Sequence, residues 1–289
     1  MHKNPEPIEP TLESLVDLAK AGNKESLEAL VRRIQDRIYG LALRMLYRPQ
    51  DAEDTTQEIL IKIITHLDSF EGRSRFSTWA YRIASNHLLN THKRIAENFN
   101  FTFGSHEQMV EQIAFYGGSA DLNEVEMVLM VEEMKRTCTQ GLLLCLRRKI
   151  RLAFILGEIF GATSTEGAEI LGITQDSFRQ RLSRGRKRIR EFMIKNCSMI
   201  NPSNTCQCKV MAMHHINSRL IDPENPRFVS HPSHGPQKAA AKSRLQELDE
   251  LGRVTALFRS HPEYAAPDAF VGIVKQLVDS QRFELFNHH

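Results

Sequence analysis

The chain has 289 residues, of which 41% are hydrophobic and 25% charged, enough for more than one globular unit. No apolar stretch approaches the roughly 18 residues of a membrane span, and the N-terminal "MHKNPEPIEP" has prolines and acids where a signal peptide needs an apolar run. Five cysteines are too few for a disulfide framework, and their odd number is typical of reduced thiols. We therefore expect a cytoplasmic protein with no membrane insertion.

Basic residues are concentrated in two places, although the net charge is only +3. Residues 73–94 contain five Lys and Arg residues, residues 177–190 contain seven, and neither run contains an acid. This distribution is expected of a protein that contacts phosphates at two positions on a nucleic acid.

The first half of the chain is predicted to form helices with short breaks. Residues 24–47 have apolar side chains at helical spacing, and Pro49 interrupts the pattern. A second helix is expected from Asp51, in "DAEDTTQEILIKIITHL", because the opening acids suit the positive end of a helix dipole. Its core stripe consists of Ile59, Leu60, Ile63, Ile64 and Leu67. Ile61 then faces outward among acids, either as a harmless exposed residue or as the centre of a docking surface.

A third helix is predicted in "RFSTWAYRIASNHLL", after the loop "FEGRSRF", with Ser77 as its N-cap. One face carries the apolar residues Phe76, Trp79, Ile83 and Leu88. Another face carries the polar stripe Arg82, Asn86, Asn90 and Lys93. Residues from about 96 to 123 are rich in glycine and polar side chains and are expected to form an extended linker.

The clearest motif is a helix-turn-helix in "STEGAEILGITQDSFRQRLSRGRKRIREFM". Ala168 is the small residue that allows the helices to approach, Gly172 makes the turn, and Phe178 anchors the second helix. The second helix buries Phe178, Leu182, Ile189 and Met193. Its outward, N-terminal part is where recognition helices carry the groups that meet base edges in the major groove. The motif therefore predicts DNA binding.

The last 95 or so residues contain further patterns. Residues 197–235 are predicted to form a loop, and residues 236–289 a helical hairpin. The hairpin would bury Leu245, Leu248, Leu251, Val254 and Phe258 against Phe270, Ile273, Val274 and Leu277. This extension is interpreted either as a built-in regulator or as a passive, stabilising tail.

Cys206, Cys208, His214 and His215 are the residues that a zinc or redox site in the extension would use. Their Cys-x-Cys spacing departs from the two-residue gap usual in zinc knuckles. We therefore expect no metal and no other cofactor.

The chain resembles RNA polymerase sigma factors of the extracytoplasmic-function (ECF) type, within the sigma-70 family. The resemblance spans residues 15–195 and is carried by "DAEDTTQEILIKI", "FEGRSRFSTWAYRIASNHLLNTHKR" and "LRRKIRLAFILGEIFGATSTEGAEILGITQDSFRQRLSRGRKRIREF". It implies an all-α protein without catalytic activity. Its partners would be core RNA polymerase and promoter DNA, with an anti-sigma factor as a further candidate.

The resemblance also implies a division into domains. These are an N-terminal tail (1–14), sigma region 2 (15–96), a flexible linker (97–122), sigma region 4 with the helix-turn-helix (123–196), the loop (197–235) and the helical extension (236–289). In this family region 2 binds the polymerase and melts the minus-ten element of the promoter, and region 4 binds the minus-35 element.

Site residues follow from the positions that match. The minus-ten set is Arg73, Arg75, Trp79, Tyr81, Arg82, Asn86, Lys93 and Arg94. The minus-35 set is Gln175, Asp176, Ser177, Arg179, Gln180, Arg181, Arg184 and Arg188. The polymerase-docking set is Asp54, Gln57, Glu58 and Ile61. The turn departs from the family pattern at Asp176, which either accepts from a cytosine amino group or caps the helix, so the promoter sequence does not transfer.

Two other classes of protein remain as alternatives. A helix-turn-helix repressor or activator would bind duplex DNA alone and would not need the docking set. A nucleic-acid enzyme would need a carboxylate cluster, a nucleophile or a phosphate-binding loop, and the sequence contains no such constellation.

Overall fold

The computed structural model describes residues 9–91, 101–113, 115–119, 121–229 and 250–260, together with residues 264, 266, 267, 270 and 272. In chain order its elements are α1 (Leu12–Lys20), α2 (Lys24–Leu46), α3 (Pro49–Thr65), η1 (Leu67–Ser69), α4 (Phe76–Asn90), α6 (Phe103–Ile113), α7 (Glu124–Leu144), α8 (Arg148–Phe154), the π-helix η2 (Ile155–Ile159), α9 (Ser164–Leu171), α10 (Gln175–Asn196), α11 (Cys208–Asn217) and α13 (Glu250–Arg259). The predicted all-α class is confirmed, since the one strand-like feature of these ranges is an isolated bridge between Cys197 and Cys206. No helix in the described part of the chain combines the length and apolar character that a membrane span requires.

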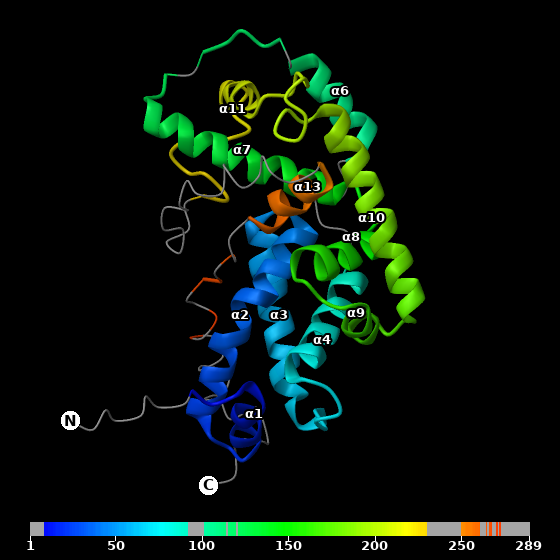
Figure 1. Cartoon of the computed structure of the whole chain (residues 1–289). Coiled ribbons are helices and arrows are strands. Elements are labelled where there is room, and N and C mark those ends of the chain that lie inside the picture. The colour runs from blue at the N-terminus through cyan, green and yellow to red at the C-terminus, as the bar shows by residue number, and fades with distance from the viewer. Residues whose placement is uncertain are drawn as a thin grey trace, which may run out of the picture.

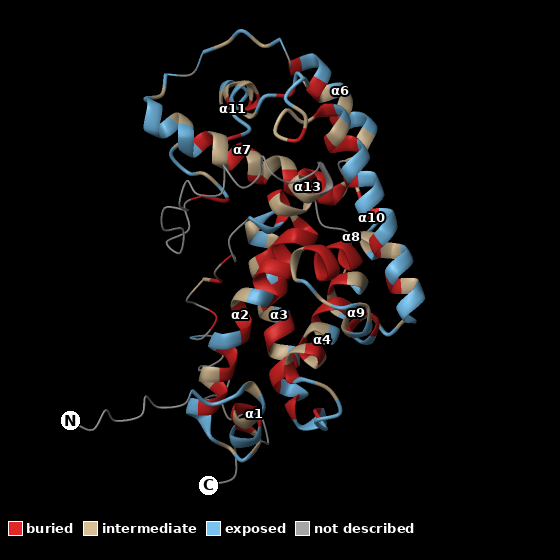
Figure 2. Ribbon diagram, in the orientation of Figure 1, coloured by how far each residue is buried: buried red, intermediate tan, exposed pale blue. Residues whose placement is uncertain are grey.

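The helices form two groups that pack against each other (Figure 1). Helices α1 to α4 make one bundle, and α6 to α11 make the other, in which α8 and α9 lie between α4 and α10. A single cluster of buried apolar side chains runs through both groups, as the buried ribbon in Figure 2 shows. The separate domains expected from the sequence are therefore in contact, chiefly between α4 and α9 and between α2 and α7.

The buried guanidinium of Arg151 joins the two groups. From α8 it donates to the carbonyl oxygens of Met45, at the end of α2, and of Leu144 and Leu146, at the end of α7. Carbonyl groups in the last turn of a helix have no partner within the helix, so a buried arginine satisfies them well. Arg151 thereby links the end of α2 to the end of α7.

The boundaries of α3 and α4 differ from those expected. Helix α3 begins at Pro49, because proline at the first helical position needs no backbone partner. Helix α4 begins at Phe76, so Ser77 is not its N-cap. The amide of Phe76 instead donates to the carboxylate Oε1 of Glu13 on α1, at 3.1 Å. A distant side chain supplies this cap, and local sequence could not reveal it.

The predicted linker and loop both contain helices. Helix α6 lies within residues 97–122, where an extended connection was expected, and it packs on α10. Helix α11 lies within residues 197–235 and packs on α7. Both helices are short, and their stability depends on these tertiary contacts rather than on their own propensity.

The predicted hairpin is only partly described, and its packing differs from the prediction. Val254 and Phe258 of α13 are buried, and so is Phe270, but Phe258 packs on Phe154 of α8 and Phe270 packs on Tyr39 of α2. The expectation that these two side chains face each other is therefore wrong. The other members of the proposed stripes lie outside the described residues or have undescribed side chains, namely Leu245, Leu248, Leu251, Ile273, Val274 and Leu277.

Candidate nucleic-acid interfaces

The helix-turn-helix is formed by α9 and α10. Thr163 and Glu166 make a capping box at the start of α9, and Thr174 caps α10 by accepting from the Ser177 amide at 3.2 Å. Gly172 ends α9 in the left-handed conformation, with φ of 59°, which favours glycine. These local signals set the turn between the two helices.

Gly167 and Ala168 of α9 are both buried. A Cβ atom on Gly167 would lie 2.2 Å from Cζ of Phe178, which is fully buried. Gly167 is therefore a second small residue that the packing of Phe178 requires, beside the Ala168 expected from the sequence. Phe178, Leu182, Ile189 and Met193 are buried as predicted.

The minus-35 set lies along the outward face of α10. Six of its members are exposed, and Ser177 and Arg181 are half-buried. Asp176 pairs with Arg179 one turn later, and Thr174 makes the cap, so the capping role considered for Asp176 is wrong. Arg186 differs from its basic neighbours, because its Nε donates to the buried carboxylate of Glu158. The open face of α10 is strongly basic and offers several guanidinium groups to a nucleic acid.

Within the minus-ten set, the aromatic and charged members occupy different surroundings. Trp79 is half-buried and packs on the rings of Phe70 and Phe76, each at 5.5 Å between centroids. Arg73, Arg82 and Asn86 are exposed, and Arg73 pairs with Glu71. Lys93 and Arg94 lie outside the described residues.

The remaining members, Arg75 and Tyr81, contact the helix-turn-helix half of the molecule. The Tyr81 ring packs on Phe160, with 5.8 Å between centroids. Arg75 Nη1 lies 3.6 Å from Glu166 Oε1 of α9. Hydrogen bonds from Thr163 are the main reason that the pKa of Glu166 is lowered, and the positive charge of Arg75 adds to them. Helix α9 therefore lies against part of the predicted minus-ten surface.

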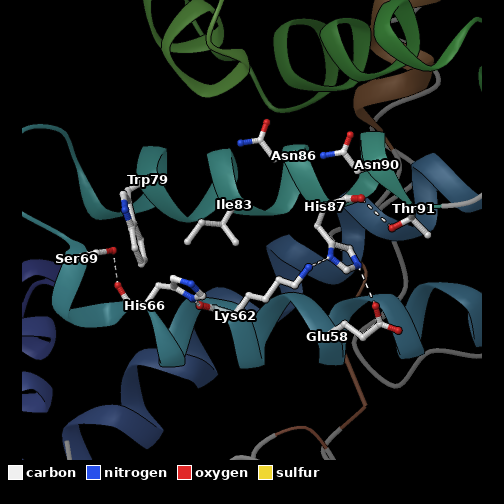
Figure 3. A pocket seen from close by; sticks show the side chains of 10 residues that line it. All are labelled: Glu58, Lys62, His66, Ser69, Trp79, Ile83, Asn86, His87, Asn90 and Thr91. Carbon is white, nitrogen blue, oxygen red and sulfur yellow. Dashed lines mark hydrogen bonds and ion pairs between the residues drawn. The ribbon is translucent and has the colours of Figure 1, made fainter.

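A groove of about 750 Å³ separates α3 from α4 (Figure 3). Trp79, Ile83 and His87 point into it from α4, whereas Asn86 and Asn90 point away from α3. On the opposite wall, Glu58 Oε2 lies 3.0 Å from His87 Nε2, and Lys62 Nζ lies 2.7 Å from His87 Nδ1. Glu58 of the docking set thus lines the same groove as Trp79 and Asn86 of the minus-ten set.

Lys62 and His87 also line the groove, although the sequence did not predict them as site residues. The only available signal was the spacing of Glu58 and Lys62, one helical turn apart on α3. His87 gave no such signal, because its position opposite α3 depends on how α3 and α4 pack.

The docking set follows the outer side of α3. Asp54 and Glu58 are exposed, and Gln57 and Ile61 are half-buried. The core stripe of Ile59, Leu60, Ile63, Ile64 and Leu67 is buried as predicted. An acidic, partly apolar helical surface therefore remains open on the molecule.

The structure does not support the zinc hypothesis. Among the residues it describes, no three His, Cys, Asp or Glu side chains are placed to hold a metal. His214 packs on the Tyr116 ring, and His215 Nδ1 lies 2.8 Å from the Met211 carbonyl oxygen. Burial raises the pKa of the Cys206 thiol to about 12 and of the Cys208 thiol to about 11, which disfavours the reactive thiolate form of both side chains.

The sequence of this chain is similar to those of known proteins. Residues 30–97 match the Sigma-70 region 2 family. The RNA polymerase sigma-H factor of Pseudomonas aeruginosa is 29% identical over 184 residues, which are 61% of this chain and 91% of that protein. The ECF RNA polymerase sigma factor SigW of Bacillus subtilis is 29% identical over 185 residues, 64% of this chain and 97% of SigW. The ECF RNA polymerase sigma-E factor of Escherichia coli K12 is 31% identical over 183 residues, 61% of this chain and 90% of that factor.

These alignments span nearly the whole of each relative, while more than a third of this chain lies outside each of them. Together with the helical fold and the open helix-turn-helix, they assign the class of protein. The chain belongs to the ECF family of RNA polymerase sigma factors.

Proposed function

We propose that this sigma factor directs core RNA polymerase to promoters through three surfaces: the docking set on α3, the minus-ten set on α4 and the minus-35 set on α10. Sigma factors are non-catalytic subunits, so the chemistry of RNA synthesis belongs to the polymerase. The observation that carries the proposal is the presence, in one chain, of exposed arginines on the recognition helix α10 and exposed acids on α3 in the other half.

The charges of the surfaces suit different partners. The guanidinium groups on α10 match phosphates and the acceptor atoms of guanine in the major groove. Asp54, Glu58 and Ile61 on α3 offer acids around an apolar side chain, which suits a protein surface rather than DNA. The groove between α3 and α4 is lined by Glu58 of the docking set and by Trp79 of the minus-ten set. The Trp79 ring can support an unpaired base by stacking.

The proposal includes place and partners. The protein would act in the bacterial cytoplasm, where polymerase and promoters are found. An anti-sigma factor is a further candidate partner. In a pull-down from cells, it would be identified as a protein that binds the docking set in competition with core polymerase.

The decisive experiment is runoff transcription with purified core polymerase on a panel of promoters. Glu58→Lys and Ile61→Asp should each weaken core binding about tenfold or more, because each places an unsuitable group in the interface. Asp17→Lys is the matched control, since it makes the same charge change at an exposed position of α1. A chain that never joins core polymerase but binds duplex DNA tightly by itself would instead be a helix-turn-helix regulator.

A further inference from the structure

The C-terminal residues that the structure describes contact both halves of the molecule. On the helix-turn-helix side, Val254, Leu257 and Phe258 of α13 are buried. The Phe258 ring meets Phe154 of α8 edge to face, with 5.3 Å between centroids. Burial of these apolar side chains stabilises the docked segment against the entropy cost of ordering it.

The same segment then reaches α2 in the other bundle. Tyr264 is 2% exposed, and its ring centroid lies 4.6 Å below the Arg44 guanidinium carbon, within the range of a cation–π contact. The Ala266 amide donates to Asp36 Oδ1 at 2.8 Å. Phe270 packs on Tyr39, with 6.5 Å between ring centroids. The described residues of this segment, from Val254 to Arg259 and at Tyr264, Ala266 and Phe270, therefore contact both sides of the junction between the two bundles (Figure 1).

A buried carboxylate on η2 connects the segment to the recognition helix. The Glu158 side chain is 4% exposed and pairs with Arg186 of α10. Arg259 of α13 donates from Nε to the Glu158 carbonyl oxygen at 2.7 Å, and its Nη2 lies 3.8 Å from Oε1 of the same residue. Glu158 thus contacts both Arg259 of the C-terminal segment and Arg186 of the recognition helix. Single-turn π-helices such as η2 are frequent at functional sites.

In the structure, the helix-turn-helix half of the chain contacts part of the predicted minus-ten surface, and we call this arrangement closed. Tyr81 of α4 rests on Phe160, and Arg75 pairs with Glu166. A cavity of about 400 Å³ remains between α2, α4 and α9, and Tyr264 and Arg259 form part of its wall. A promoter strand could reach the Tyr81 ring only after α9 had moved away. The polymerase-docking face of α3 is not covered in this way.

We propose that the described C-terminal residues, Val254 to Arg259 with Tyr264, Ala266 and Phe270, form an intramolecular clasp, which holds the two bundles closed and withholds part of the minus-ten surface until the clasp is displaced. This inference rests on the proposed function for its effect on transcription. A segment that binds only the closed arrangement shifts the population toward it by its full binding free energy. The clasp would therefore reduce promoter opening without reducing the affinity for core polymerase.

The test compares Tyr264→Ala with Tyr264→Phe in the full-length chain. The alanine variant loses the ring that packs on Arg44, whereas the phenylalanine variant keeps that ring and loses only the hydrogen bond from Gln140 Nε2, which is 3.2 Å long. Hydroxyl-radical footprinting of the free protein reports directly on the closed contact. We expect oxidation of Tyr81 and Phe160 to rise several-fold in Tyr264→Ala and to stay near wild type in Tyr264→Phe.

Trp79 is the internal control, because it packs within the α1–α4 bundle and should react equally in all three proteins. Runoff transcription at equal core occupancy should rise several-fold in Tyr264→Ala. Arg259→Ala, which acts at the other end of the clasp, should have the same direction of effect. Unchanged oxidation of Tyr81 and Phe160 in both alanine variants would overturn the clasp.

A fall in runoff at wild-type core binding would also overturn it, because the segment would then support the active arrangement. Failure of the proposed function has a different signature. In that case none of the proteins joins core polymerase, while the footprint alone still decides whether the segment holds the bundles closed.

Discussion

Helices α10 and α4 carry the two predicted sets of DNA contacts, and they present them differently. The recognition face of α10 is open to solvent along most of its length, whereas α4 places Tyr81 and Arg75 against the helix-turn-helix half of the same chain. The face of α10 is thus free of such contacts along most of its length, whereas part of the α4 surface contacts the other half of the chain. The comparison teaches that duplex recognition and strand capture need not become available together, even though one chain provides both.

The largest effect is expected from changing the packing that positions α10. Gly167→Val would drive a side chain into the Phe178 ring, at a cost of about 3 kcal/mol in unfolding free energy. Promoter-specific runoff should be lost while core binding through α3 persists. Thermal unfolding and runoff measure the two consequences. Gly117→Val is the control, because Gly117 is exposed and a Cβ atom placed on it would have no neighbour within 4 Å. Wild-type stability and runoff in Gly167→Val would contradict the packing of α9 on α10.

The next largest effect concerns base reading by the open face of α10. Arg184→Ala and Arg179→Ala should each lower minus-35-dependent transcription, since a good bidentate base contact contributes about 1 to 3 kcal/mol of discrimination. If an arginine contacts only phosphate, its substitution should instead weaken binding to all sequences and reduce the slope of log affinity against log salt concentration by about 1. Runoff from a randomised minus-35 library separates the two outcomes. Lys209→Ala, a change on α11 away from the recognition helix, is the control. Unchanged output across the library in both variants would remove these arginines from the interface.

A smaller effect is expected from pH at the other end of α10. Burial lowers the pKa of His106, which packs on Phe192, to about 4. The unfolded chain binds a proton near pH 6.5 and the folded chain does not, so stability falls as the pH drops from 6.5 toward 4. Between pH 7 and 5.5 this should cost about 1 kcal/mol in urea unfolding. His106→Gln should flatten the slope, apart from a contribution of His215, whose pKa is also lowered by burial. An equal slope in both proteins would exclude His106 as its source.

The smallest effect is expected from the ion pair that joins α4 to α9. Glu166→Gln removes the charge opposite Arg75 but keeps a side chain that can complete the capping box with Thr163. Because the Arg75 side chain is 78% exposed, the pair should contribute no more than about 0.5 kcal/mol to the closed arrangement. Footprinting of Tyr81 should therefore change little. A large increase would show that the ion pair, rather than the apolar contacts, holds α9 on α4.

Several parts of the fold and the site could be predicted because their causes are local. The buried stripe of α3 follows from helical periodicity, and the turn at Gly172 follows from the left-handed conformation that glycine tolerates. The exposed arginines of α10 lie on the outward face because Phe178 and Leu182 occupy the inward one. In each case the deciding residues lie within two helical turns of one another.

The sequence by itself determined the all-α class, the helix-turn-helix and the family, because helix periodicity, capping and motif order are all written in neighbouring residues. Only the tertiary structure decided what covers the exposed or amphipathic faces. Phe258 needed an apolar partner, but its pattern did not say that the partner is Phe154 rather than Phe270. Likewise, Ala266 and Asp36 are separated by 230 positions, and Glu13 caps a helix that begins 63 residues later. An apolar stripe specifies that it must be buried, while shape and charge across the assembled bundles select the surface that buries it.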